Sequence, residues 1–156
     1  MKNTALALVL SFTMVFLGGC IKDTESCQPK TVESEDAAML TYAATTGLTF
    51  TKHSSGLYYY IENPGSGLTP SSTNTVSVKY VGKLTNGTIF DQTTTTPVSF
   101  TLGGVILGWQ LGVPLIKKGG KIKLIIPSSY AYGCTANGPI PAYSVLYFEI
   151  ELIDVL

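Results

Sequence analysis

Apolar and polar residues alternate in several stretches of this chain, a pattern typical of β-strands with one covered face. The clearest stretch is Val76–Tyr80, in which Ser77 and Lys79 separate the apolar residues. The same alternation predicts strands at residues 57–61, 98–102, 121–126 and 145–152. In the last of these, one face is apolar and the other acidic: Leu146, Phe148, Ile150 and Leu152 against Glu149 and Glu151.

Turn signals separate the predicted strands. Asn86-Gly87 predicts a tight hairpin with a type I′ turn, because both residues tolerate the positive φ that this turn requires. The Thr93–Thr96 run is interpreted as a loop. The segment 117–123, rich in lysine and glycine, predicts a second hairpin turn followed by lysines that face solvent.

Two segments have the features of helices. The first spans residues 35–46, with Ser34 as its N-cap and Gly47 at its end. The second spans residues 105–113 and stops near Pro114. Several strands with one short internal helix indicate an α+β domain, an antiparallel sheet curled around that helix. The pattern leaves the order of the strands open.

The first helix is predicted to be amphipathic. Glu35 and Asp36 suit the positive N-terminal end of the helix dipole. Met39, Leu40 and Ala43 form its apolar stripe. Two interpretations of this stripe stay open: it packs on the domain, or it forms a dimer contact.

Residues 1–19 have the features of an export signal. Lys2 precedes an apolar run that is too short to span a bilayer, since a spanning helix needs about 20 residues. The run ends in Leu17-Gly18-Gly19-Cys20, which resembles a bacterial lipobox, so Cys20 is expected to be lipidated and to begin the mature chain. The alternatives are an ordinary signal peptide with a chance cysteine and an N-terminal membrane anchor.

The charge balance argues against a nucleic-acid partner. Ten basic residues, all of them Lys, match ten acids, and no basic face is apparent. Five acids precede the expected domain: Asp23, Glu25, Glu33, Glu35 and Asp36. We expect residues 20–47 to be a lipidated acidic tether with a short helix, and residues 48–156 to be the folded domain. The acidic segment would be a solvated spacer or a sorting signal.

No residue cluster suggests a metal site or a cofactor. His53, the only histidine, lies in a polar loop without an acid or nucleophile at motif spacing, so we expect it to be exposed and inert. The sequence contains neither a phosphate-binding glycine loop nor a nucleophile elbow. We therefore expect a protein without metal or cofactor.

Three segments together resemble the FKBP-type peptidyl-prolyl isomerases. They are Val76–Asp91, Val105–Gly112 and Pro127–Gly133, and they occur in the family's order at nearly its spacing. The resemblance covers about Gly56 to Leu156. It implies the same α+β fold and an enzyme that isomerises the peptide bond before proline without a cofactor.

The resemblance also implies roles for single residues. Its catalytic pocket would comprise Tyr80, Phe90, Asp91, Val105, Ile106, Trp109, Tyr132 and Phe148. Trp109 would lie under the proline ring, and the Ile106 amide and the Tyr132 hydroxyl would bind substrate carbonyls. Asp91, at the edge of the pocket, would orient or polarise the substrate during catalysis. The rim that a substrate meets would include Val98, Phe100 and Ile140. Taken singly, each aromatic is an ordinary core residue and Asp91 a turn residue.

The rim departs from the family pattern. Val98 stands where an aromatic is frequent, and Ala136 stands where many members carry a histidine. The loop at residues 92–96 is shorter than usual and holds no Arg to pair with Asp91. These changes leave the floor of the pocket intact. Affinity for the macrolide inhibitors that bind this pocket in the family therefore stays open.

The resemblance and the export signal together imply a lipid-anchored isomerase that assists the folding of exported proteins at the bacterial envelope. We expect a monomer in the outer membrane, on its periplasmic or surface face. Its partners would be proline-containing polypeptides, the membrane through Cys20, and macrolides. The alternative is a non-catalytic envelope lipoprotein that binds proline-containing or unfolded segments, although the full set of pocket residues favours the enzyme.

Two cysteines remain once Cys20 is lipidated. Cys27 lies in the tether and Cys134 follows the last pocket motif. An exported protein meets an oxidising compartment, where thiols pair if their Cα atoms approach within about 7 Å. A disulfide would hold the tether beside the pocket. Otherwise both cysteines are free, with Cys134 buried as a small apolar residue.

Overall fold

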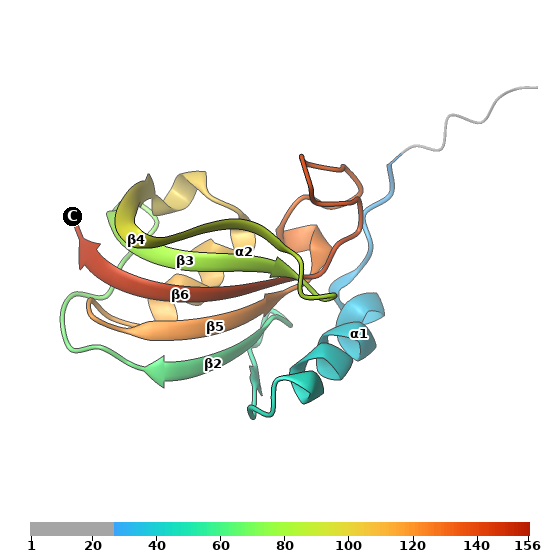
Figure 1. Ribbon diagram of the computed structural model, residues 1–156, viewed down its shortest axis with the longest axis horizontal. Helices are drawn as coiled ribbons and strands as arrows, with labels where there is room; N and C mark the ends of the chain where they lie inside the picture. Colours follow the sequence, from blue (N-terminus) through green and yellow to red (C-terminus); the bar gives the residue numbers. More distant parts are fainter. Residues whose placement is uncertain (1–26) are drawn as a thin grey trace, which may run out of the picture.

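The computed structural model describes residues 27–156 and consists of one antiparallel sheet with helices on both of its faces (Figure 1). The strand order is β1-β2-β5-β6-β3-β4. The helices and strands, in chain order, are α1 (Val32–Thr45), β1 (Thr51–Lys52), β2 (Tyr58–Asn63), β3 (Thr75–Leu84), β4 (Ile89–Thr101), α2 (Leu107–Gly112), β5 (Lys121–Ile126) and β6 (Leu146–Val155). Short 3-10 turns follow β4, α2 and β5. The predicted α+β fold is confirmed.

The signal peptide predicted for residues 1–19 and the lipid site at Cys20 lie outside the described residues, as do Asp23 and Glu25. In the part of the chain that the structure describes, no helix is both long enough and apolar enough to cross a membrane. The lipid anchor therefore stays a prediction.

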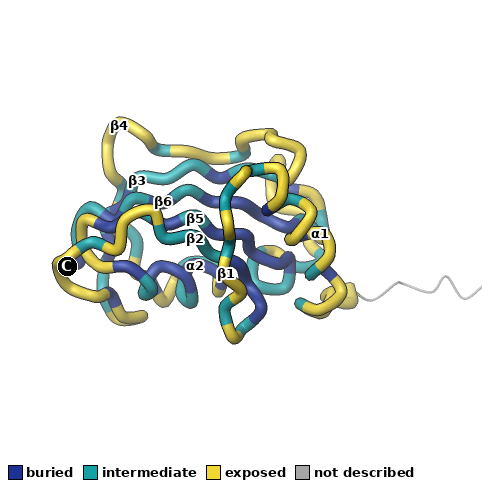
Figure 2. Tube along the Cα trace, turned by 90° about the horizontal axis from the view of Figure 1, so that it is seen from below, coloured by how far each residue is buried: buried dark blue, intermediate teal, exposed yellow. Residues whose placement is uncertain are grey.

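The central strands are covered on both faces, because successive side chains of a strand point to opposite sides. Leu124 of β5 and Phe148 of β6 enter a large apolar cluster with Trp109 of α2. Their neighbours Ile125 and Tyr147 enter a second cluster, with Met39 of α1. Figure 2 shows β5 and β6 as the buried centre of the sheet and β4 as its exposed edge.

Helix α2 lies close to the sheet because two glycines face β5. A Cβ atom at Gly108 would lie 2.3 Å from Cγ2 of Ile126, and one at Gly112 would lie 2.5 Å from Cδ1 of Leu124. The helix is shorter than the predicted 105–113. Residues 105 and 106 are extended, and Val113–Leu115, which contains a proline, forms a 3-10 turn.

Helix α1 begins earlier than predicted, and Ser34 is not its cap. Thr31 takes that position, since its hydroxyl accepts a hydrogen bond from the Ser34 amide at 3.2 Å. The predicted apolar stripe is only partly buried: Met39 and Ala43 are buried, while Leu40 is 49% exposed. The acid expected to face solvent, Glu35, is 3% exposed, so the acidic segment is not simply a solvated tether.

The hairpin between β3 and β4 is not the predicted type I′ turn. Among the residues of this turn, Gly87 alone has a positive φ, of 88°, and its amide donates a hydrogen bond to the Leu84 carbonyl at 2.9 Å. The loop is therefore a three-residue turn with one left-handed glycine. The Thr93–Thr96 loop prediction is also wrong. These threonines belong to β4, because β-branched residues favour strands, although the pairing register with β3 shifts between Thr93 and Val98.

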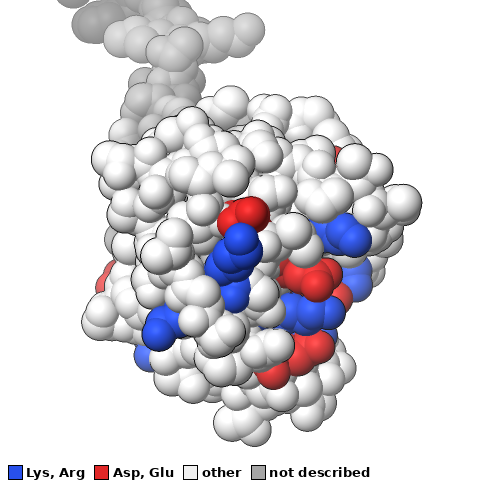
Figure 3. All heavy atoms as spheres, turned by 90° about the vertical axis from the view of Figure 1, so that its left-hand side faces the viewer, with Lys and Arg blue, Asp and Glu red and all other residues white. Residues whose placement is uncertain are grey.

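The lysines of β5 alternate with buried residues, as the pattern predicted. Lys121 lies 3.6 Å from Glu151, and Lys123 lies 3.7 Å from Glu62. On the face shown in Figure 3, basic and acidic side chains lie next to one another and form no large patch of one sign. His53 is partly buried, contrary to expectation, and its Nδ1 lies 2.9 Å from the Ser55 hydroxyl.

Candidate active site

A pocket of about 380 Å³ lies between β3, β4, β6, α2 and the segment that follows β5. Its lining is mostly apolar and aromatic, as is usual for sites that bind small organic groups. The lining residues are Tyr80, Phe90, Asp91, Phe100, Gly104, Val105, Ile106, Trp109, Tyr132 and Phe148. The structure thus brings together all eight residues that the resemblance placed in the pocket: seven come from the three motif segments, and Phe148 comes from β6.

Trp109 occupies the centre of this aromatic set. Its ring meets Tyr80 edge-to-face with centroids 5.2 Å apart, and meets Phe148 in the same way at 5.3 Å. Phe100 makes a third edge-to-face contact with it, at 6.0 Å. The indole is 4% exposed, and no described group accepts a hydrogen bond from its Nε1. These edge-to-face contacts pack the rings of the pocket against one another.

Gly82 of β3 makes room for one wall and was not predicted. A Cβ atom there would lie 2.6 Å from the ring of Phe90 and 2.9 Å from that of Phe148. The two rings themselves meet edge-to-face, with centroids 5.5 Å apart. The isolated glycine within the strand pattern was the available signal, since such a glycine often marks the close approach of another group.

The polar side of the pocket is formed by Tyr80 of β3 and Asp91 of β4, which lie diagonally across this strand pair. The Tyr80 hydroxyl donates a hydrogen bond to Oδ2 of Asp91. Burial and this bond to a carboxylate hold the pKa of Tyr80 well above its ordinary value. Tyr80 is therefore a protonated donor at every physiological pH, and the aspartate stays exposed at the mouth.

The backbone that precedes α2 forms the aliphatic side of the pocket. The Gln110 side chain donates to the Val105 carbonyl at 2.8 Å and to the Gly103 carbonyl at 3.3 Å, and so holds this segment in place. Ile106 takes the N-cap position of α2. Gly104, which sequence reasoning missed, also lines the pocket.

Of the three predicted rim residues, Phe100 is the one that lines the pocket, and it touches Trp109. Val98 is partly buried against the main apolar cluster, and Ile140 is 4% exposed within it, so neither is among the lining residues. Tyr132, at 37% exposure, is a pocket residue that stands at the mouth, as Asp91 does.

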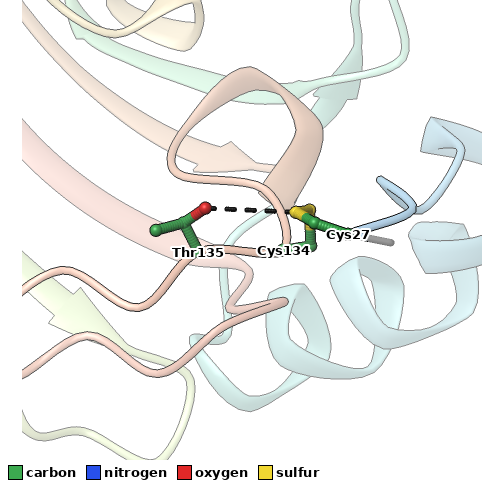
Figure 4. Close-up of a disulfide and its surroundings, with 3 residues drawn as sticks. All are labelled: Cys27, Cys134 and Thr135. Carbon is green, nitrogen blue, oxygen red and sulfur yellow. Dashed lines mark hydrogen bonds between the residues drawn. A yellow bond between two sulfur atoms is a disulfide. The ribbon is translucent and has the colours of Figure 1, made fainter. Parts of the chain in front are cut away.

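A disulfide joins Cys27 to Cys134, with Cα atoms 5.5 Å apart (Figure 4). The sulfur of Cys27 also lies 4.0 Å from the Thr135 hydroxyl. The cross-link closes a separation of 107 residues and places the start of the described chain beside the segment that carries Tyr132.

The family model for the FKBP-type peptidyl-prolyl cis-trans isomerases matches residues 67–153. The chain belongs to this family. The prediction made from the three motifs is confirmed. The matched region contains every residue that lines the pocket, whereas α1 and Cys27 precede it.

Bacterial proteins named as FKBP-type isomerases resemble about two thirds of the chain. FkpA of Escherichia coli strain K12 is 48% identical over 104 residues, and FkpA of Buchnera aphidicola from Acyrthosiphon pisum is 49% identical over 107 residues. These alignments cover 65% and 67% of this chain. They cover only 38% and 44% of the relatives, so the chain spans about two fifths of the length of the curated relatives that it matches.

Solved structures show the same fold. The crystal structure of Escherichia coli FkpA matches with a TM-score of 0.70 and 41% identity, over 80% of this chain and 60% of the other. A peptidyl-prolyl cis-trans isomerase from Pseudomonas syringae matches with a TM-score of 0.67 and 36% identity. That match covers 82% of this chain and 98% of the other.

Proposed function

We propose that this protein catalyses the cis–trans isomerisation of X-Pro peptide bonds in exported polypeptides at the bacterial envelope. The observation that carries the proposal is the preformed aromatic pocket with Trp109 at its floor. Its volume suits a proline ring with its neighbouring groups, and family membership supports the same chemistry.

The residues of the pocket suit this reaction. Rotation about a peptide bond meets a barrier of about 18–20 kcal/mol, because the twisted amide loses its resonance. The twisted amide also has less charge separation than the planar one, so an apolar pocket favours it relative to water. The Tyr132 hydroxyl and the Ile106 amide would hold substrate carbonyls on either side. Lowering the barrier by about 5 kcal/mol would accelerate the reaction roughly ten-thousandfold.

The direct test uses the protein from residue 21 onward, which lacks the predicted lipid site. We expect it to accelerate cis–trans exchange in short peptides that contain an apolar residue before proline, and a macrolide inhibitor of the family to compete with them. Binding of these peptides without acceleration, by a correctly folded protein, would instead favour a non-catalytic binding module.

The proposed location depends on Cys20. Expressed in a bacterium, the full chain should fractionate with membranes and incorporate labelled fatty acid. Cys20→Ser should abolish both, because the proposed acceptor of the lipid is lost. Acylation that persists in this variant would show that Cys20 is not the lipid site.

A further inference from the structure

Helix α1 buries one acid against the segment that follows β5. Glu35 is 3% exposed, and its Oε2 accepts hydrogen bonds from the Ser128 amide at 2.7 Å and from the Ser128 hydroxyl at 2.9 Å. Ser128 is itself fully buried. Hydrogen bonds to a carboxylate are about twice as strong as neutral ones, so this contact ties α1 firmly to residue 128.

Ser128 in turn holds the turn that carries Tyr132. Its carbonyl accepts hydrogen bonds from the Ala131 amide at 2.9 Å and from the Gly133 amide at 2.8 Å. These two residues flank Tyr132 directly. A shift of Ser128 would therefore move both neighbours of the residue whose side chain stands at the mouth of the pocket.

We propose that Glu35 is a positioning residue for the isomerase, which fixes the Tyr132 hydroxyl for substrate binding by holding Ser128. This inference rests on the proposed function, since Tyr132 acts there as a donor to a substrate carbonyl. Glu35 precedes the region matched by the family model, so helix α1 adds a support to a pocket that is built from other elements.

The surroundings of Glu35 fit positioning better than general packing. Its Oε1 is buried and has no hydrogen-bond partner among the described residues, and the Lys30 ammonium lies 3.9 Å away. Burying a carboxylate is costly, and an apolar side chain of similar size would often stabilise a protein as well or better. Helix α1 also has separate attachments: Met39 is buried, and Asp36 binds Lys52.

Asp36 supplies a matched control within the same helix. Its Oδ1 accepts hydrogen bonds from the Lys52 ammonium at 2.6 Å and from the Tyr58 hydroxyl at 2.9 Å. Neither partner belongs to the turn at residues 128–133. Asp36→Ala therefore removes a pair of hydrogen bonds from α1, as Glu35→Ala does, but leaves the contact with Ser128 in place.

The experiment compares steady-state isomerase kinetics of the protein from residue 21 onward with those of three variants. Glu35→Ala should raise KM about three- to tenfold, the effect of one lost hydrogen bond, with kcat little changed. Glu35→Gln keeps an oxygen that can accept both bonds from Ser128, so its KM should return close to the wild-type value. Asp36→Ala should also leave KM close to wild type.

A double-mutant cycle separates positioning from a loss of stability. In a Tyr132→Phe background, Glu35→Ala should raise KM no further, because the hydroxyl that it positions is already absent. Equal rises in KM for Glu35→Ala and Asp36→Ala, or a full further rise in the Tyr132→Phe background, would overturn the inference. If Glu35→Ala does not fold, Ser128→Ala, which removes only the hydroxyl bond, takes its place in the cycle with a smaller expected effect.

Hydrogen exchange gives a readout that needs no activity. The amides of Ala131 and Gly133 should exchange faster in Glu35→Ala, and at the wild-type rate in Asp36→Ala. Unchanged exchange in Glu35→Ala would overturn the inference even if the enzyme is active. A wild-type protein without isomerase activity would overturn the proposed function, and the exchange result would still decide whether Glu35 holds the turn.

Discussion

The two faces of the sheet use the same strands in different ways. On the α2 face, Phe148 and its neighbours meet Trp109, and the cover is incomplete, so a pocket of about 380 Å³ stays open. On the α1 face, Tyr147 and Ile125 are covered by Met39 in a smaller cluster. Helix α1 is also held there by the hydrogen bonds of Glu35 and by the disulfide of Cys27, which precedes the helix.

The difference shows how a domain can separate chemistry from support. The α2 face lies within the region matched by the family model, and its aromatic rings leave a concave apolar surface. Helix α1 and Cys27 precede that region and reach around to the segment that carries Tyr132. We therefore expect changes on the α2 face to alter catalysis, and most changes on the α1 face to alter stability alone.

The sharpest test of this contrast replaces one large buried side chain on each face by alanine. Trp109→Ala should cost about 3–5 kcal/mol of unfolding free energy and lower kcat/KM about tenfold or more, because it removes the pocket floor. Met39→Ala should cost about 2–5 kcal/mol but leave kcat/KM of the folded protein unchanged. Chemical denaturation measures the unfolding free energy of each variant, and peptide isomerisation assays measure its kcat/KM. Equal kinetic losses in the two variants would break the contrast.

Removal of the disulfide should have the next largest effect, a loss of stability. Cys27→Ser with Cys134→Ser should cost about 2–4 kcal/mol of unfolding free energy, since the cross-link limits the unfolded chain. Denaturant titrations with and without a reducing agent measure this. The wild type should lose stability on reduction and the double variant should not. A wild type that is unaffected by reductant would show that the cross-link does not support the α1 face.

A smaller effect is expected at the polar side of the pocket. Asp91→Asn should lower kcat/KM a few-fold, because the amide is a weaker partner for Tyr80 than the carboxylate. Isomerisation transfers no proton, so the rate of the wild type should be flat between about pH 6 and 8. A steep profile that disappears in the variant would indicate acid–base catalysis instead.

The smallest effect concerns acid stability on the α1 face. Hydrogen bonds from Lys52 and Tyr58 hold the pKa of Asp36 below its ordinary value. Its contribution to stability is therefore present above about pH 4, the value of an unfolded aspartate, and is lost as the pH falls through the folded pKa. Asp36→Asn should reduce the difference in unfolding free energy between pH 7 and pH 3. An unchanged difference would place the acid sensitivity elsewhere.

Local patterns predicted much of the fold and of the pocket. The alternation in β3, β5 and β6 assigned the faces of these strands correctly, because the period of two is a property of the strand itself. The three motifs contain seven of the eight pocket residues that the resemblance named, Phe148 of β6 is the eighth, and all eight line the cavity. The predictions for the threonine run of β4 and for the turn at Gly87 were wrong: the run lies inside β4 where its register with β3 shifts, and only Gly87 of that turn has a positive φ.

The sequence by itself determined the apolar faces of the strands, the family and the residue types of the pocket, since these depend on local spacing and motif order. Only the tertiary structure decided that Val98 and Ile140 pack with the main apolar cluster and do not line the pocket, that Gly82 makes room for Phe90, and that Glu35 meets Ser128. The last contact joins residues 93 positions apart. Nothing local specifies such a pair, because its partners meet only when the folded sheet places α1 against the segment that follows β5.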